Sequence, residues 1–76
     1  MNDKITEAIL KVINSSNAPL ETKEITALIN NKNITRTKLF YRLNMLRGDG
    51  LIKGKFVGPG KGVWIWWRTN YFQNEP

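Results

Sequence analysis

The sequence predicts an α+β fold in which three helices precede a C-terminal β-hairpin. Leu39, Leu43 and Leu46 follow the i, i+4, i+7 spacing that places side chains on one face of a helix. After them the sequence changes to β-branched and aromatic residues, interrupted by a glycine-rich stretch, which is typical of two strands and their turn. The two expected strands are 51–57 and 63–68, with the turn at 58–62.

The first helix is predicted from its apolar periodicity. Asp3 is well placed as its N-cap, and the helix is expected to extend for about a dozen residues. Leu10 lies off the predicted buried face, where it either widens the buried arc or contacts a partner. The residues expected on the buried face are Ile5, Ala8, Ile9, Val12 and Ile13.

The second helix is expected after a break at Pro19, because proline interrupts helical structure. Leu20 can form a short extended segment, and Thr22 is a plausible N-cap for a helix that runs to about Asn30. Its predicted buried residues are Ile25, Leu28 and Ile29.

The third helix has clear start and stop signals. An asparagine-rich turn at 30–33 precedes it, and asparagine tolerates the left-handed backbone of tight turns. Ile34 and Thr35 are typical of an apolar staple followed by an N-cap. The helix is expected to end at Arg47 or Gly48.

The net charge of +6 is unevenly distributed. Residues 1–31 hold three basic and four acidic side chains, whereas residues 32–68 hold nine basic side chains and one acidic side chain, Asp49. Such an asymmetry favours a polyanionic partner, above all nucleic acid. A basic surface that only keeps the protein in solution is the alternative interpretation.

Composition argues against several other classes of protein. The chain has 76 residues, which suits one small domain, and it contains neither cysteine nor histidine. We therefore expect no disulfide, no thiolate metal site, no cofactor and no enzymatic activity, since the usual general base is missing. No apolar run approaches the ~20 residues of a membrane span. A soluble protein is expected, either cytoplasmic and associated with the nucleoid or, in a eukaryote, nuclear.

The order and lengths of these elements resemble the winged helix-turn-helix domain, with the hairpin as the wing. The resemblance covers about residues 3–68, which leaves 69–76 as an irregular tail. It is most specific at Leu20, at Ile34-Thr35-Arg36 and at Gly50-Leu51-Ile52, which look like MarR-type and similar small prokaryotic or archaeal regulators. The long helices through which MarR proteins dimerise have no counterpart here, so the resemblance does not imply that dimer. It does imply a DNA-binding protein that regulates transcription.

In such a domain the third helix enters the major groove of double-stranded DNA, and residues near its N-terminus reach the base edges. Arginine pairs with guanine, threonine contacts bases, and tyrosine packs on sugar or binds phosphate. An ordinary solvated helix face is the alternative. The predicted contacts on the helix are Arg36, Thr37, Lys38, Tyr41 and Arg42, and those on the wing, to the backbone or minor groove, are Lys53, Lys55 and Lys61.

The tryptophan-rich strand has two apolar faces. Trp64 and Trp66 share one face, while Val63, Ile65 and Trp67 share the other, because side chains alternate along a strand. One face is expected in the core, and the surplus could meet the tail, a homodimer partner, another protein or unpaired bases. A protein-interaction module and an RNA or single-strand binder are therefore alternative functions. The residues of this candidate protein interface are Trp64, Trp66, Trp67, Tyr71 and Phe72.

Overall fold

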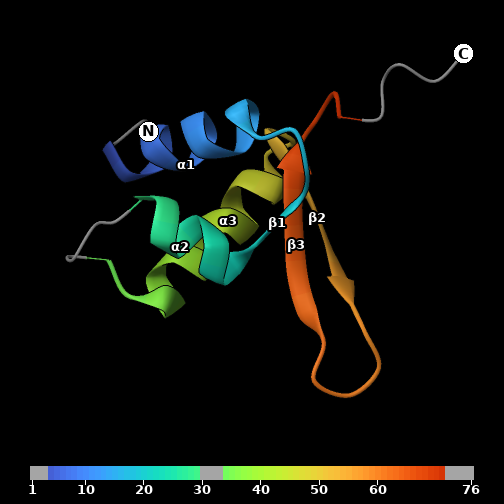
Figure 1. The fold of residues 1–76 in the computed structure, drawn as a ribbon. Coiled ribbons are helices and arrows are strands. Elements are labelled where there is room, and N and C mark those ends of the chain that lie inside the picture. The colour runs from blue at the N-terminus through green and yellow to red at the C-terminus, as the bar shows by residue number, and fades with distance from the viewer. Residues whose placement is uncertain (1–3, 30–33, 72–76) are drawn as a thin grey trace, which may run out of the picture.

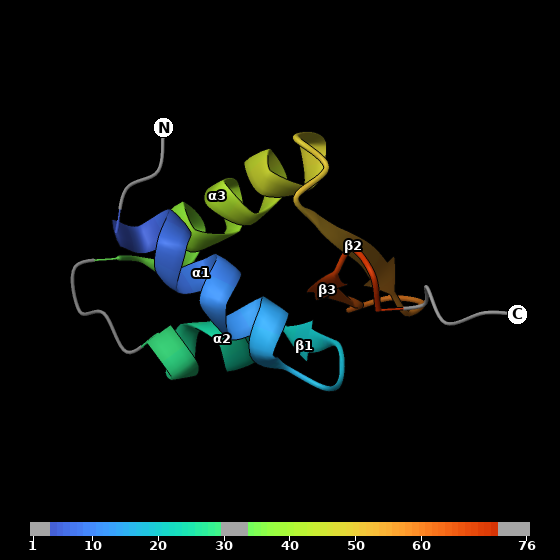
Figure 2. The same ribbon diagram turned by 90° about the horizontal axis from the view of Figure 1, so that it is seen from above.

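The computed structural model describes residues 4–29 and 34–71, and in them three helices lie together on one side of a three-stranded antiparallel sheet (Figures 1 and 2). The strand order is β1-β3-β2, so the hairpin provides the central strand and one edge. The turn of the hairpin projects beyond the helices (Figure 1). The elements are α1 (Lys4–Ser15), β1 (Leu20–Glu21), α2 (Thr22–Ile29), α3 (Arg36–Gly48), β2 (Ile52–Val57) and β3 (Val63–Arg68).

The predicted three helices and hairpin are confirmed, and α3 begins and ends as its sequence indicates. The Thr35 hydroxyl accepts a hydrogen bond from the backbone N–H of Lys38 at 3.1 Å, which caps the helix. At the other end Gly50 has a φ of 78°, and the N–H of Leu51 donates to the carbonyl of Leu46 at 3.0 Å. This left-handed glycine, which follows the C-cap residue Asp49, turns the chain from α3 into β2. The Asp3 cap and the turn at 30–33 lie outside the described residues.

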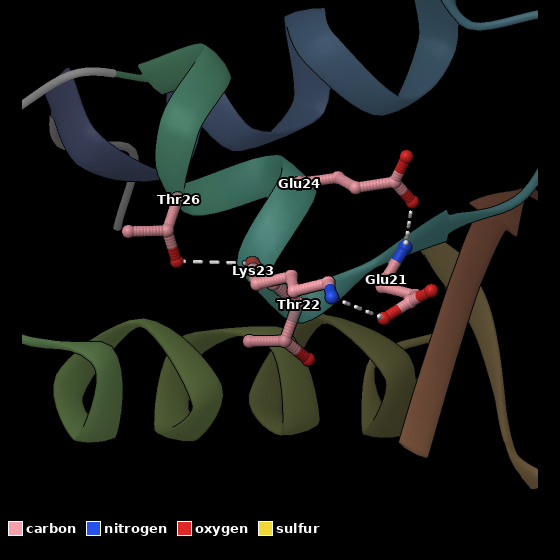
Figure 3. Close-up of polar contacts among 5 residues, drawn as sticks. All are labelled: Glu21, Thr22, Lys23, Glu24 and Thr26. Carbon is pink, nitrogen blue, oxygen red and sulfur yellow. Dashed lines mark hydrogen bonds and ion pairs between the residues drawn. The ribbon is translucent and has the colours of Figure 1, made fainter.

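The start of α2 differs from the expectation that Thr22 caps it. The helix begins at Thr22 itself, and the preceding N–H, that of Glu21, donates to the Glu24 carboxylate at 2.7 Å (Figure 3). The Thr22 hydroxyl instead accepts a hydrogen bond from the indole N–H of Trp66 at 2.9 Å. Glu24 thus satisfies the free N–H at the helix start, while Thr22 links α2 to the sheet.

The core lies between the helices and the inner face of the sheet. Thr6 is also buried there, and Leu10 packs against the core, so Leu10 widens the buried arc of α1. Leu28 was expected to be buried, but it is 61% exposed, because it lines an open groove between α2 and α1 and does not reach the core. The buried hydrophobic residues are Ile9, Ile13, Ile25, Leu39, Leu43, Leu46, Ile52 and Trp66.

The register of the hairpin decides which face of the tryptophan strand points inward. Gly54 pairs with Trp66, and Phe56 pairs with Trp64, so these residues share the face that meets the helices. Trp66 is fully buried, and its assignment to an exposed protein interface is therefore wrong. The opposite, outer face of the sheet carries Lys53, Lys55, Val57, Val63, Ile65 and Trp67.

The absence of a side chain at Gly54 leaves the space that the Trp66 ring occupies in the core. A Cβ atom at Gly54 would lie 2.5 Å from the Trp66 ring, so we expect Gly54→Ala to lower the free energy of unfolding by about 1–3 kcal/mol. Gly48→Ala is the matched control, because nothing lies within 4 Å of the added atom. There alanine should stabilise α3 by about 0.5–1 kcal/mol. Urea unfolding followed by circular dichroism measures both changes, and equal effects would contradict the packing of Gly54 against Trp66.

Candidate nucleic-acid interface

The N-terminal half of α3 presents polar and basic side chains to solvent. The three leucines of this helix are buried in the core, and their burial fixes which side of α3 faces outward. No ion pair joins Arg36 or Lys38 to another described residue. Their charges are therefore available to an anionic ligand. The exposed residues among those predicted for this helix are Arg36, Thr37, Lys38 and Tyr41.

The start of α3 and the wing line one open groove of about 360 Å³. Arg36 from α3 and Trp64 from β3 both line it, and Lys61 is exposed in the turn of the wing, next to the lining residue Gly62. The fold therefore brings the basic end of α3 and the wing to the same side of the molecule. The residues that line the groove are Glu21, Thr22, Arg36, Thr37, Phe40, Gly62, Val63 and Trp64.

An aromatic cluster holds the wing against α3. The rings of Trp64 and Trp66 stack at 5.2 Å, and the Phe40 ring meets both of them edge-on at about 6 Å. The Arg47 guanidinium lies 5.2 Å from the centroid of the Trp64 ring, within the range of a cation–π contact. Neither Phe40 nor Arg47 was singled out for this role from the sequence, because their contacts join segments distant in the chain.

Arg42 lies differently from the other predicted contacts on α3. Its side chain is half-buried, and its guanidinium Nη1 donates a hydrogen bond to the hydroxyl of Thr6 on α1 at 3.1 Å. Thr6 is itself buried. Arg42 therefore joins α3 to α1, a role for which no signal exists in the sequence, since the two residues are 36 positions apart.

This contact predicts a loss of stability on substitution. Arg42→Ala removes a hydrogen bond from a charged donor to the buried Thr6 hydroxyl, so we expect the free energy of unfolding to fall by about 1–3 kcal/mol. Arg36→Ala, on the exposed side of the same helix, should change it by less than about 0.5 kcal/mol. Thermal unfolding of both variants in parallel measures the difference. Equal stability of the two variants would show that the contact with Thr6 contributes nothing.

The remaining predicted site residues fall into two groups. Lys53 and Lys55 are exposed, but on the outer face of the sheet, away from α3. Trp64, Trp67 and Tyr71 are half-buried, and the Arg68 guanidinium lies 5.3 Å from the centroid of the Tyr71 ring. Phe72 lies outside the described residues. A role for these aromatic residues in a protein interface stays a prediction, with Trp66 removed from it.

None of the helices in the described part of the chain has the length and apolar character needed to cross a membrane. No cluster of three or more aspartate, glutamate, cysteine or histidine side chains that could bind a metal ion occurs among the residues at 4–29 and 34–71.

The helices, the hairpin and the groove between them define a winged helix-turn-helix domain. Comparison with solved structures supports this class: the chain is similar to diamide-treated YodB from B. subtilis, with a TM-score of 0.69. The similarity covers 95% of this chain and 70% of the YodB chain at 20% sequence identity, so it concerns the fold. No protein-family model matches the sequence, and no curated protein matches it.

Proposed function

We propose that this winged helix-turn-helix protein binds double-stranded DNA and acts as a small transcriptional regulator. In this proposal the N-terminal half of α3 enters the major groove, and the wing contacts the backbone or the minor groove. The observation that carries the proposal is the exposed basic start of α3, which shares one groove with the wing. Helices of this kind read bases with their first turns while neighbouring cations bind phosphates.

The residue types at these positions suit such a contact. Arg36 can pair with guanine through two hydrogen bonds, and Thr37 can contact a base or a thymine methyl group. Lys38 and the wing residue Lys61 supply positive charge for phosphates, and the Tyr41 side chain, which is 66% exposed, can pack on sugar. Arg42 is engaged with Thr6, so its predicted part in base reading ranks below that of Arg36.

The finer assignment to a regulator resembling the MarR type is also a proposal. It is supported by Ile34-Thr35-Arg36 at the start of α3, where Thr35 acts as the N-cap, and by the glycine turn at Gly50 that leads into β2. A two-fold homodimer is part of this proposal, because regulators of this kind commonly bind palindromic sites. The homodimer can be tested with DNA sequences selected by binding from a random duplex pool. Paired half-sites in those sequences would support the dimer, and single half-sites would contradict it.

Selection of bound sequences from random duplex DNA tests the proposal most directly, because it reports affinity, sequence preference and half-site symmetry together. The affinity for a selected site should fall with salt. If Lys38 and Lys61 each neutralise one phosphate while Arg36 reads a base, the slope of log K against log[salt] should be about −1.8, and it should be about −2.7 if Arg36 binds a phosphate as well. Absence of binding to any duplex at ~50 mM salt, where phosphate contacts are strong, would end the proposal.

A further inference from the structure

Strand β2 forms an open edge of the sheet. It pairs with β3 along all six of its residues, and the order β1-β3-β2 leaves its other side without a neighbouring strand in the described chain. No further backbone hydrogen bond to β2 is found among the described residues. Four of the six side chains of β2 are exposed: Lys53, Lys55, Phe56 and Val57. A row of backbone donors and acceptors is thus accessible along this edge.

The exposed side chains give this edge a chemical pattern. Lys53 and Lys55 lie on the outer face of the sheet, two residues apart, which corresponds to roughly 6.6 Å along a strand. Neither lysine forms an ion pair with another described residue. Phe56 points to the other face, where its side chain is 49% exposed near the end of the strand. A neighbouring strand would therefore meet positive charge on one face and an aromatic ring on the other.

We propose that the β2 edge binds an extended acidic segment of a partner protein as a fourth strand of the sheet. Backbone hydrogen bonds would supply the common part of the affinity, as in other cases of strand addition. Alternate acidic side chains of the partner would lie opposite Lys53 and Lys55, and the apolar residues between them would lie on the face of Phe56. Opposite charges across neighbouring strands stabilise such pairs.

The same two lysines disfavour a second copy of this chain as the partner at this edge. A two-fold antiparallel pairing of two β2 strands centred on Gly54 places Lys53 of one copy opposite Lys55 of the other. Like charges directly opposite each other are destabilising, and lysines on edge strands are a common protection against self-association. The edge thus favours an acidic strand over a second β2 strand paired in this register, which gives selectivity through repulsion as well as attraction. This inference does not depend on DNA binding by α3.

Fluorescence anisotropy with the full chain and a labelled synthetic peptide of alternating glutamate and valine tests the proposal. We expect this peptide to bind and two control peptides to fail. The first control has the same composition with its glutamates in one block, and the second is N-methylated throughout, so it retains its charges but has lost its N–H donors. Equal binding of either control would overturn strand addition, since attraction by charge alone would then explain the result. Stronger competition by single-stranded DNA than by the free peptide would also overturn it.

Charge reversal on the protein tests the role of the two lysines. The double variant K53E/K55E should bind the alternating glutamate peptide at least about tenfold more weakly and should gain binding to the corresponding lysine peptide. The double variant K4E/K11E changes the net charge equally on exposed positions of α1 and should leave peptide binding unchanged. Circular dichroism confirms that both variants fold. Equal losses in the two variants would refute the proposal, because net charge would then account for binding.

Discussion

Replacing Trp66 with alanine is expected to lower the free energy of unfolding by about 3–5 kcal/mol, the largest effect of any single substitution considered for this protein. Trp66 is fully buried in the centre of the sheet, where its ring contacts Phe40 and Trp64. A domain of this length has a total stability of roughly 4–11 kcal/mol. The variant should therefore be largely unfolded, or should melt at least about 12 °C lower than the original protein.

Thermal and urea unfolding followed by far-ultraviolet circular dichroism measure this effect, since the helices report on the whole domain. Trp67→Ala is the matched control, because Trp67 is half-buried on the outer face of the same strand and should lose less than half as much stability. Thr22→Val separates the hydrogen bond from the packing. It removes the acceptor of the Trp66 indole N–H and should destabilise by about 1–3 kcal/mol. Equal losses at Trp66 and Trp67 would contradict the assignment of the two faces.

The elements of the fold follow from local signals that each span only a few residues. The leucine spacing of α3, its Thr35 cap and the stop at Gly50 all act within the helix or its ends, and the structure confirms each of them. The change to β-branched and aromatic residues, interrupted by a glycine-rich stretch, then predicts the hairpin. Such features can be predicted from a single sequence because the interacting groups are neighbours along the chain.

The contacts between elements could not be predicted in the same way. Alternation along β3 sorts Trp64 and Trp66 from Trp67, but both sets are apolar, so the pattern alone does not say which set faces the helices. The pairing of Gly54 with Trp66 settles it, because only glycine leaves space for the buried ring. The prediction that Leu28 is buried was wrong, since an apolar residue at a helical spacing need not reach the core.

The same distinction between local signals and contacts between elements applies to the candidate site. The exposure of Arg36, Thr37 and Lys38 follows from the burial of the leucines on the other side of α3, so a helical projection is sufficient to predict it. Arg42 belongs to the same projection, yet its long side chain reaches Thr6 on another helix. Lys53 and Lys55 depend on the hairpin register, which places them on the outer face. Charge counted along the sequence locates a basic region but not the direction of each cation.

The double substitution Arg36→Ala and Lys38→Ala is expected to weaken binding to a selected duplex about a hundredfold while leaving stability nearly unchanged. Both side chains are exposed, and neither forms an ion pair with a described residue, so their removal disturbs only contacts with the ligand. Losses of roughly 1–3 kcal/mol for a base contact and a smaller loss for a phosphate contact combine to this magnitude. Titrations at several salt concentrations measure it.

The salt dependence of the double variant separates the two kinds of contact. If both side chains bind phosphates, the slope of log K against log[salt] should become less negative by about 1.8, and sequence preference should persist. If Arg36 instead reads a base, the slope should change by about 0.9, and preference at one position should relax. The variant K4A/K11A, which removes two exposed cations from α1, should retain nearly full affinity. A loss as large in that control would mean that binding depends on total charge rather than on the exposed start of α3, and the proposed docking of this helix in the major groove would be wrong.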